Sequence, residues 1–182
     1  MKQARCSVFI AVSLDGYIAR EDGGLDWLEA ANATVTGGED CGYAHFMKSV
    51  DAIIMGRKSY EKVRSFGAWP YGDTAVVVLS RKALEIPESL AATVSHSSET
   101  PEALCKRLAG QGYKRLYIDG GITIQRFLAA GLITDLTITT IPVILGGGTP
   151  LFGRLDRDVA LKHVSTTSYD FGFVQSTYDI VG

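Results

Sequence analysis

Four short apolar runs along the chain show almost no alternation between apolar and polar residues. They read SVFIAVSL (residues 7–14), DAIIM (51–55), AVVVL (75–79) and LYI (116–118). Strands with one face in water alternate, whereas strands covered on both faces are apolar nearly throughout and rich in Val and Ile. Helical spacing of apolar residues separates these runs along the chain. The pattern therefore predicts parallel strands joined by helices that cover both faces of one sheet.

Four stretches between or after these runs have helical spacing. They are residues 43–50, residues 57–63 after Gly56, residues 100–112, and residues 122–130 before Gly131. The third stretch opens with Thr100 as N-cap and Pro101 at the first helical position, an arrangement that helix N-termini favour. Gly131 is placed to end the fourth. We expect a helix over each stretch.

The C-terminal segment follows a different pattern. DLTITTIPVIL (135–145), VALKHVSTT (159–167) and FVQSTYDIV (173–181) alternate in part. No helical spacing separates the last two, which predicts an antiparallel hairpin. We therefore expect a three-layer α/β fold with a mostly parallel central sheet, an antiparallel C-terminal edge and helices on both faces. A length of 182 residues predicts one domain over residues 1–182.

The composition argues against nucleic-acid and membrane partners and favours the cytoplasm. A formal charge of -2 with 21% charged residues lacks the basic excess of nucleic-acid-binding proteins. No apolar run has the ~20 residues of a membrane span, and Ser13 and Asp15 interrupt the first apolar run, which argues against a secretory signal. Cys6, Cys41 and Cys105 lie far apart without a C-x-x-C pair. We expect free thiols in the cytoplasm, no metal site, and no membrane or nucleic-acid partner.

Two adjacent glycines, Gly120 and Gly121, separate the fourth apolar run from its helix. Without Cβ atoms the chain can turn tightly there, and a phosphate can approach the unpaired N–H groups at the helix start. Such a junction is as often a plain turn. The dinucleotide motif G-x-G-x-x-G is absent, and so is a complete G-x-x-x-x-G-K-[ST] loop. The glycine pair alone is a weak indication of a ligand.

Two other apolar runs end in residues that suit an anion. A glycine, two cations and a hydroxyl occupy residues 56–59, and Ser80, Arg81 and Lys82 end the third run. Ligands of open α/β sheets bind at the carboxyl ends of the strands. One such turn is a solvated loop more often than a site. Together the three turns favour a long anionic cofactor whose phosphates contact separate turns.

These motifs, in their order and spacing, resemble the cofactor-binding motifs of the dihydrofolate reductase superfamily. The matching segments read MGRKSYEKV, VVVLSRK and YIDGGITIQRFL. SLDGYIA, DGGITI and IPVILGGGTPLF resemble one branch, which contains the reductase domain of the riboflavin-biosynthesis deaminase-reductase and its stand-alone relatives. The resemblance covers nearly the whole chain. It implies a dihydrofolate-reductase-like fold and NADPH-dependent hydride transfer to a heterocycle with a C=N or comparable bond.

The resemblance also implies a role for each turn. Ala11 and Ile18 would flank the nicotinamide. Ser80 and Arg81 would meet the phosphate on the adenosine ribose. The residues that would hold the diphosphate and the adenosine end are Gly56, Arg57, Lys58, Ser59, Gly120, Gly121, Ile122 and Thr123.

The chain departs from the pattern of its relatives at several positions. It lacks the H-x-E and P-C-x-x-C motifs of the zinc-dependent deaminase half. Tyr17 stands where the riboflavin enzymes usually carry a basic residue, and DGG replaces their usual EGG. Trp27 remains in LDWL, but the Pro-Trp pair usual in dihydrofolate reductases is incomplete. The substrate is therefore left open among pterins, folates and pyrimidine-like compounds.

Reduction of a C=N bond needs a proton as well as a hydride, and a carboxyl group can supply it. Counting back from the MGR turn to the acid position of dihydrofolate reductases leads to Asp40, with Glu39 second. The alternative is that Asp40 only caps the helix that begins near Tyr43, in which case the proton comes from water. Thr139 matches the position of a hydroxyl near the substrate and its acid, although it can equally be a plain strand threonine.

We expect the substrate pocket to open between the helix near Asp40 and the loop that holds Trp27, with Thr139 on its floor. Trp27 and Tyr43 are the candidate substrate contacts, and Tyr43 is otherwise a core residue. Residues 146–148, three glycines, form a flexible turn expected to lie against the AREDGGLDW loop (residues 19–27), which would permit a lid-like motion.

Two classes of function follow. The first is an NADPH-dependent reductase of a small heterocycle, and relatives in this branch are often homodimers. The second is a non-catalytic NADP(H)-binding protein on the same fold. Arg57 and Arg81, each just beyond a strand end, predict NADPH over NADH because guanidinium groups recognise the additional phosphate of NADPH.

Overall fold

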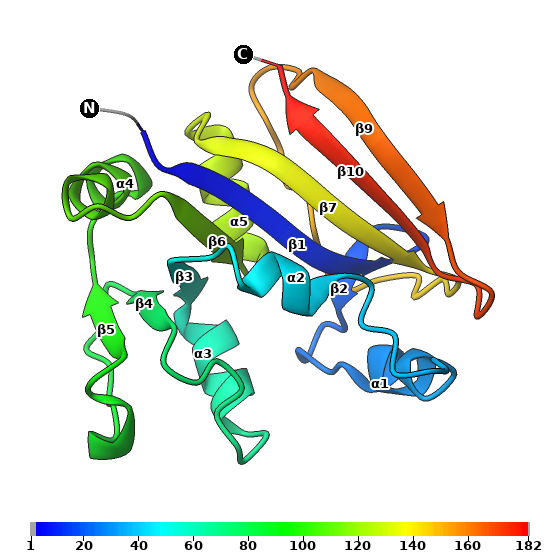
Figure 1. Ribbon diagram of the computed structural model, residues 1–182, viewed down its shortest axis with the longest axis horizontal. Coiled ribbons are helices and arrows are strands. Elements are labelled where there is room, and N and C mark those ends of the chain that lie inside the picture. Colours follow the sequence, from blue (N-terminus) through cyan, green and yellow to red (C-terminus); the bar gives the residue numbers. More distant parts are fainter. Residues whose placement is uncertain (1–2, 182) are drawn as a thin grey trace.

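The computed structural model describes residues 3–181, which form an eight-stranded sheet with helices on both faces (Figure 1). The strand order is β5-β4-β3-β6-β1-β7-β10-β9. Neighbours from β5 to β7 are parallel, whereas β10 is antiparallel to both β7 and β9. The mostly parallel sheet and its antiparallel C-terminal edge are confirmed. The strands are β1 (Arg5–Ser13), β3 (Ala52–Gly56), β4 (Ala75–Leu79), β5 (Val94–Ser97), β6 (Arg115–Asp119), β7 (Ile133–Ile141), β9 (Leu161–Ser168) and β10 (Val174–Ile180).

Four of the five helices within residues 3–181 lie close to stretches that the sequence predicts to be helical, and the first has no predicted counterpart. The five are α1 (Asp26–Asn32), α2 (Tyr43–Met47), α3 (Arg57–Arg64), α4 (Pro101–Gly110) and α5 (Gly121–Ala129), with a 3-10 turn at Glu88–Leu90. The Thr100 hydroxyl accepts the N–H of Ala103 at 3.3 Å and so caps α4. Gly131 has φ +67 just beyond α5, which suits glycine at a helix end. Helix α2 stops at Met47 and is shorter than the predicted 43–50.

Strand β3 shows why the apolar runs do not alternate. Ala52 and Ile54 pack into one core cluster with α4 and α5, whereas Ile53 and Met55 pack into another with α2 and α3. Successive side chains of a strand point to opposite faces, so a strand covered on both faces needs apolar residues at every position. The two layers of helices are therefore a direct consequence of the runs in the sequence.

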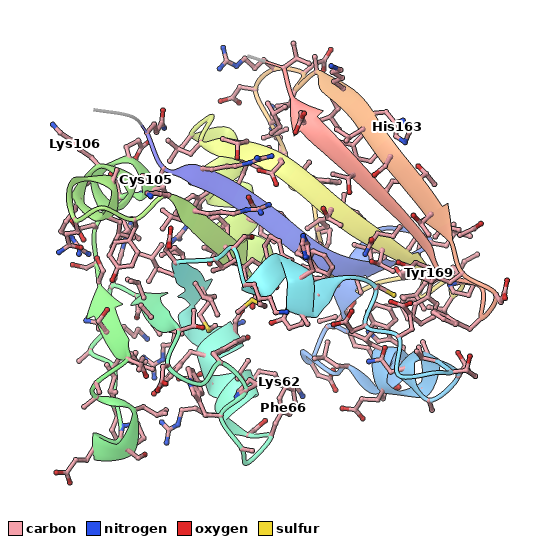
Figure 2. The ribbon with its side chains drawn as sticks, viewed as in Figure 1. Lys62, Phe66, Cys105, Lys106, His163 and Tyr169 are labelled. Atoms are coloured by element: carbon pink, nitrogen blue, oxygen red, sulfur yellow. The ribbon has the colours of Figure 1, made fainter. Side chains whose placement is uncertain are left out.

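Three elements have no clear signal in the sequence. Strand β5 has only its first and last residues buried, and α1 buries only Trp27. The third is a small second sheet of two short strands, β2 (Tyr17–Ala19) and β8 (Thr149–Pro150). Each of these elements is too short or too exposed for periodicity to indicate it. Strand β9 is exposed along its length, and Figure 2 shows His163 projecting from it.

A buried carboxylate, Asp135, joins three parallel strands at the edge opposite the glycine turns. Its oxygens lie 2.8 Å from Arg5 Nε, 2.8 Å from Ser7 Oγ and 3.1 Å from the Arg115 guanidinium. Burial alone would raise the pKa of Asp135, but the hydrogen bonds from Arg5, Thr134 and Ser7 outweigh it and hold that pKa below its usual range. Asp135 therefore links β1, β6 and β7 as a charged group.

A second carboxylate, Asp15, fastens the loop after β1 to the glycine turn at residues 146–148. It accepts the hydroxyl of Ser13 at 2.6 Å and the N–H groups of Leu145 at 3.1 Å and Gly146 at 2.8 Å. A Cβ at Gly148 would collide with the Ala19 carbonyl. The expectation that the two glycine-rich loops lie against each other is therefore confirmed.

Within residues 3–181, no helix is both long and apolar enough to cross a membrane.

We predict that Asp135→Ala lowers the free energy of unfolding by about 2–4 kcal/mol at pH 7, because it removes the buried carboxylate that accepts hydrogen bonds from Ser7 and from two arginines. Urea unfolding measures the change. A carboxylate with a lowered pKa stabilises the fold above its ordinary pKa of about 3.9, and this contribution is lost as the pH falls through the lower folded value. The difference between wild type and variant should therefore shrink in acid.

Asp179→Asn is the matched control for Asp135. Its carboxylate lies 3.7 Å from Arg5 and is 48% exposed, so its removal should change the stability by less than about 0.5 kcal/mol. Equal losses in the two variants would contradict a structural role that is particular to Asp135.

We also predict that Asp15→Asn loosens the turn at residues 144–148. The Ser13 hydroxyl first, and then the N–H groups of Leu145 and Gly146, lower the pKa of Asp15 to about 2, so these donors bind it as a carboxylate. Amide hydrogen exchange should become faster at Leu145 and Gly146 in the variant. Asp22→Asn changes a carboxylate that accepts the N–H of Gly24 in a different turn and keeps an amide oxygen there, so it should leave the exchange at residues 144–148 unchanged.

Candidate functional site

The three predicted turns lie at one edge of the sheet. Strand β3 is parallel to β4 on one side and to β6 on the other, and its register aligns Gly56 with Leu79 and Met55 with Asp119. Parallel strands in register end at the same edge. The turns at residues 56–59, 80–82 and 120–123 therefore follow neighbouring strand ends, as the sequence analysis expects.

The first turns of α3 and α5 are in contact. A Cβ added at Gly120 would overlap the Ser59 hydroxyl, and one added at Gly56 would lie 3.0 Å from Thr123 Oγ1. Gly120 also has φ +86, a left-handed value that favours glycine. Within the described residues, no side chain caps either helix, in contrast to Thr100 on α4. The N–H groups of two helix starts thus remain available side by side.

This paired helix start has the features of a diphosphate site. Unpaired N–H groups and the positive ends of two helix dipoles favour an anion. Gly121 brings a third element to the same place, because a Cβ there would lie 3.0 Å from both Ile18 Cδ1 and Thr149 Cγ2. The predicted nicotinamide neighbour Ile18 and the predicted diphosphate turn therefore adjoin. The residues present fit a dinucleotide that crosses this edge.

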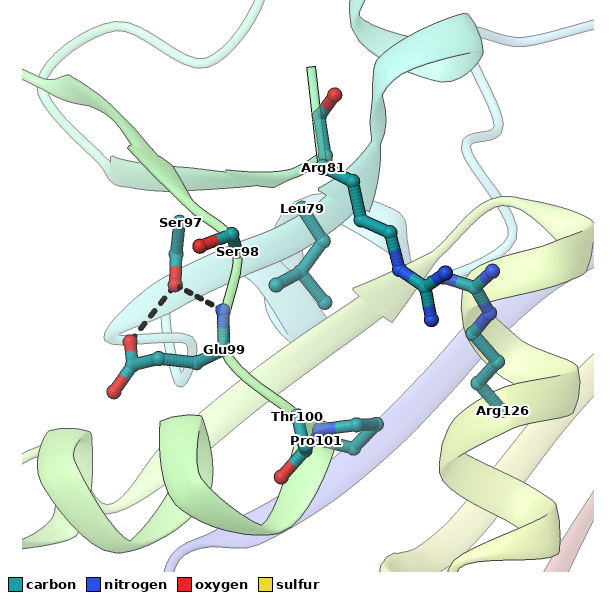
Figure 3. A pocket seen from close by; sticks show the side chains of 9 residues that line it. Leu79, Arg81, Ser97, Ser98, Glu99, Thr100, Pro101 and Arg126 are labelled. Atoms are coloured by element: carbon teal, nitrogen blue, oxygen red, sulfur yellow. Dashed lines mark hydrogen bonds between the residues drawn. The ribbon is translucent and has the colours of Figure 1, made fainter. Parts of the chain in front are cut away.

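A pocket of about 200 Å³ lies beyond this paired start, at the ends of β4 and β5 (Figure 3). Its floor and walls combine apolar groups with hydroxyls and two arginines. The lining residues are Leu79, Ser80, Arg81, Ser97, Ser98, Glu99, Thr100, Pro101 and Arg126. Figure 3 shows the side chains of Arg81 and Arg126 among those that line it. The pocket therefore presents positive charge near the predicted phosphate position of Ser80 and Arg81.

The other predicted cation, Arg57, has a carboxylate partner. Its Nε donates to Glu61 Oε1 at 2.6 Å, one helical turn along α3. Lys58 is exposed at the same helix start. Arg57 thus lies at the predicted turn, but the charge of Glu61 offsets its own.

The predicted substrate residue Thr139 lies on β7, paired in register with Ala11 of β1 and with Gln175 of β10. Thr139 is 5% exposed, and its hydroxyl accepts Gln175 Nε2 at 2.9 Å. The same amide donates to the Cys41 carbonyl at 2.9 Å. Cys41 has φ 53, and this hydrogen bond holds its strained turn against the sheet.

Gln175 adjoins the candidate site, and no motif of the sequence indicates it. It comes from the C-terminal strand, far along the chain from every motif, and only the antiparallel pairing of β10 with β7 places it beside Thr139. Alternation in FVQSTYDIV (residues 173–181) was the only signal, and alternation does not reveal the partner strand.

Trp27 lies in the third core cluster, with Ile141 and Phe173, and Ala11 packs at its border. The indole is 5% exposed, and its Nε1 has no hydrogen-bond partner among residues 3–181. Buried N–H donors are normally paired, so an unpaired one is a natural place for a ligand or water acceptor. Trp27 and Thr139 are thus both buried around Ala11, the predicted neighbour of the nicotinamide.

Asp40 is exposed and holds the turn before α2. Its two oxygens accept the N–H of Ala44 at 2.8 Å and of Gly42 at 2.9 Å. The hydrogen bond from Ala44 is the main cause that lowers the pKa of Asp40. The neighbouring Glu39 accepts the N–H of Cys41 at 2.7 Å. This geometry favours the capping interpretation of Asp40, and its role as a proton donor stays a prediction.

A different carboxyl, Asp119, ends β6 directly before the glycine pair. It is half-buried, and burial raises its pKa, against smaller opposing effects of the Gly120 N–H and the Tyr117 hydroxyl. Tyr117 donates to the Phe9 carbonyl at 2.9 Å. Burial first, and then the charge of Asp119, raises the pKa of Tyr43 to about 12. Asp119 is therefore a carboxyl with a raised pKa beside neutral tyrosines.

In the sequence, Asp119 stands out only as the first residue of DGG in place of EGG. A polar residue at the last position of a buried strand was the available signal, because the ends of such strands face the ligand edge. Among residues 3–181, no three His, Cys, Asp or Glu side chains gather into a metal-binding group.

Comparisons with known proteins agree with this geometry. The chain is 35% identical over 165 residues to the uncharacterized protein YwjB of Bacillus subtilis, covering 89% of this chain and 90% of that protein. The crystal structure of a putative riboflavin biosynthesis protein from Shewanella sp. PV-4 is 37% identical, covers 98% of this chain and 99% of its own, and superposes with a TM-score of 0.91.

A more distant structure shows the fold alone. Dihydrofolate reductase from Enterococcus faecalis is 17% identical, covers 99% of this chain and 98% of its own, and has a TM-score of 0.64. The expected dihydrofolate-reductase-like fold is thus confirmed. Residues 6–174 match the family described as the RibD C-terminal domain, and the chain belongs to that family.

Proposed function

We propose that the protein is an NADPH-dependent reductase that delivers a hydride to a C=N or comparable bond of a pterin-, folate- or pyrimidine-like heterocycle. The observation that carries the proposal is the contact between the two uncapped helix starts at Gly56 and Gly120, beside a pocket with two arginines. This edge offers separate sites for separate phosphates. Membership of a family that contains reductases supports the same reaction class.

The proposed cofactor site uses the three turns together. Residues 56–59 and 120–123 would bind the diphosphate through N–H groups, and the pocket at Ser80 and Arg81 would bind the adenosine end. Ala11 and Ile18 would flank the nicotinamide. When bound, NADPH supplies the hydride. The chain itself orients the two reactants and handles the proton.

The proposed substrate site lies on the face of the sheet that carries Thr139 and Trp27. The unpaired Trp27 Nε1 is a donor for a carbonyl or ring nitrogen. Tyr43, whose ring packs edge-on against Phe9 at 5.7 Å, would border the heterocycle. Both 5-amino-6-(5-phosphoribosylamino)uracil and dihydrofolate have the oxo groups and ring nitrogens that such donors recognise.

Asp119 is the proposed source of the proton. A general acid must retain its proton near neutral pH, and a raised pKa serves that purpose. Asp119 also lies next to the glycine turn, at the junction of the cofactor and substrate sites. Asp40 is less suited, because its hydrogen bonds to Ala44 and Gly42 favour the ionised form.

A panel assay tests the function. NADPH consumption is followed with dihydrofolate, dihydropterins and the pyrimidine intermediate of riboflavin biosynthesis, each in the presence of the wild-type protein. Turnover with at least one compound is expected, with NADPH preferred to NADH. Tight NADPH binding without turnover on any of them would favour a non-catalytic NADP(H)-binding protein, the alternative that the capping role of Asp40 supports.

We predict that Asp119→Asn lowers kcat by about a hundredfold or more and changes NADPH affinity little. In the wild type, activity should fall as the pH rises through the raised pKa of Asp119, because the acid loses its proton. The variant should lack that dependence across the pH range in which the wild type shows it. Steady-state kinetics across this range measure both effects.

Three variants make the assignment of Asp119 specific. Asp119→Glu keeps a carboxyl at the position where relatives usually carry Glu and should retain much of the activity. Asp119→Asn should unfold no more easily at neutral pH, because burial disfavours the carboxylate that it replaces. A larger loss of turnover in Asp40→Asn would instead identify Asp40 as the proton donor.

A further inference from the structure

We infer that Arg126, a residue outside every cofactor motif of the sequence, binds the phosphate on the adenosine ribose together with Arg81 and thereby selects NADPH over NADH. The inference rests on the proposed function. Both arginines line the pocket of about 200 Å³ at the ends of β4 and β5. Arg81 reaches it from the turn after β4, and Arg126 from the exposed side of α5 (Figure 3).

The two guanidinium groups carry uncompensated charge. Among residues 3–181, neither Arg81 nor Arg126 forms an ion pair, whereas Arg5, Arg20, Arg57, Arg107 and Arg115 each do. Two like charges that line one small pocket repel each other. An anion between them would convert this repulsion into two attractive contacts.

The acidic residue of the pocket does not supply that anion. Glu99 accepts the Ser97 hydroxyl at 2.8 Å, and its two oxygens accept Arg107 at 2.8 to 3.2 Å. Arg107 first, and then Ser97, lowers the pKa of Glu99. Glu99 thus has its own counter-ion on α4, and the charge near Arg81 and Arg126 stays positive.

A phosphate monoester matches this arrangement. It carries between one and two negative charges at neutral pH and three acceptor oxygens, and planar guanidinium groups donate to such oxygens in pairs. Leu79 and Pro101 add apolar surface to the same pocket, against which an adenine ring can pack. A free ribose hydroxyl, as in NADH, has no charge for the two arginines to bind.

Helix α5 places Arg126 near the proposed position of the adenosine end of the cofactor. Its first turn, at Gly121, touches α3 at the proposed diphosphate position. Arg126 stands five residues later, roughly 7–8 Å along the helix axis. A single helix can therefore contact the diphosphate with its N–H groups and the ribose phosphate with a side chain.

Arg57 is the natural comparison, because the sequence analysis expected it to share this phosphate with Arg81. Its ion pair with Glu61 at 2.6 Å already satisfies its charge, and it does not line the pocket. We therefore expect Arg57 to contribute much less than Arg126 to the choice between NADPH and NADH.

The test compares Arg126→Gln, Arg81→Gln and Arg57→Gln by calorimetric binding of NADPH, NADH, adenosine 2′,5′-bisphosphate and 5′-AMP. Arg126→Gln and Arg81→Gln should each weaken NADPH and the bisphosphate by about ten- to a hundredfold, the loss of one charge-assisted contact. Binding of NADH and 5′-AMP should change less than about threefold. Arg57→Gln should leave the ratio of NADPH to NADH affinity unchanged within about threefold, because Glu61 already pairs with its side chain.

A second variant separates charge from shape. Arg126→Lys keeps the charge but not the planar fork, so its NADPH affinity should fall between those of wild type and Arg126→Gln. The exposed position of Arg126 predicts unchanged thermal unfolding in both variants. In the wild type, higher salt should weaken the binding of NADPH and change that of NADH little, because salt screens the attraction between the two arginines and the additional phosphate.

The possible negative results distinguish a failure of the inference on Arg126 from a failure of the proposed function. Equal weakening of NADPH and NADH by Arg126→Gln would overturn the inference, and so would an unchanged preference for NADPH. If the wild type reduces a heterocycle with NADPH while Arg126→Gln keeps that preference, only the inference fails. If the wild type binds neither NADPH nor the bisphosphate, the proposed function fails, and the inference fails with it.

Discussion

The contact between the first turns of α3 and α5 is the constraint on which the rest of the site depends. A Cβ at Gly120 would overlap the Ser59 hydroxyl, and one at Gly56 would lie in tight contact with Thr123. The contact exists because β3 and β6 are adjacent, parallel and in register, so their helices start at the same level. It concentrates two positive helix ends in one place, and an anion there relieves a repulsion that the fold itself creates.

The opposite ends of the strands, where they begin, help to set that contact. Asp135 holds β1, β6 and β7 together with two arginines where these strands begin or first pair. From Ser7 onward the register of β1 and β7 persists along the strands, because a shift of one residue would turn every buried side chain to the wrong face. The ion pairs of Asp135 and the contact between the glycine turns therefore both fix the register of neighbouring strands, one where the strands begin and the other where they end.

Local features of the site were predictable from the sequence, and pairings between distant segments were not. The turns at Gly56, Ser80 and Gly120 follow buried strands, and parallel strands must end together. Gln175 was missed because its place depends on a ladder between β7 and β10. Arg126 was missed because a basic residue on an exposed helical face normally lies in water, and only the pocket of Figure 3 distinguishes it.

The position of Asp119 couples the two halves of the proposed site. Positive helix ends favour a carboxylate, yet burial raises the pKa of Asp119 in spite of the adjoining Gly120 N–H. In the proposed enzyme, a bound diphosphate would occupy those helix ends and place negative charge beside the carboxyl. This charge would disfavour the carboxylate further, since like charges raise the pKa of an acid. Cofactor binding would thus favour the protonated form of Asp119, the form that a proton donor needs when the hydride donor is bound.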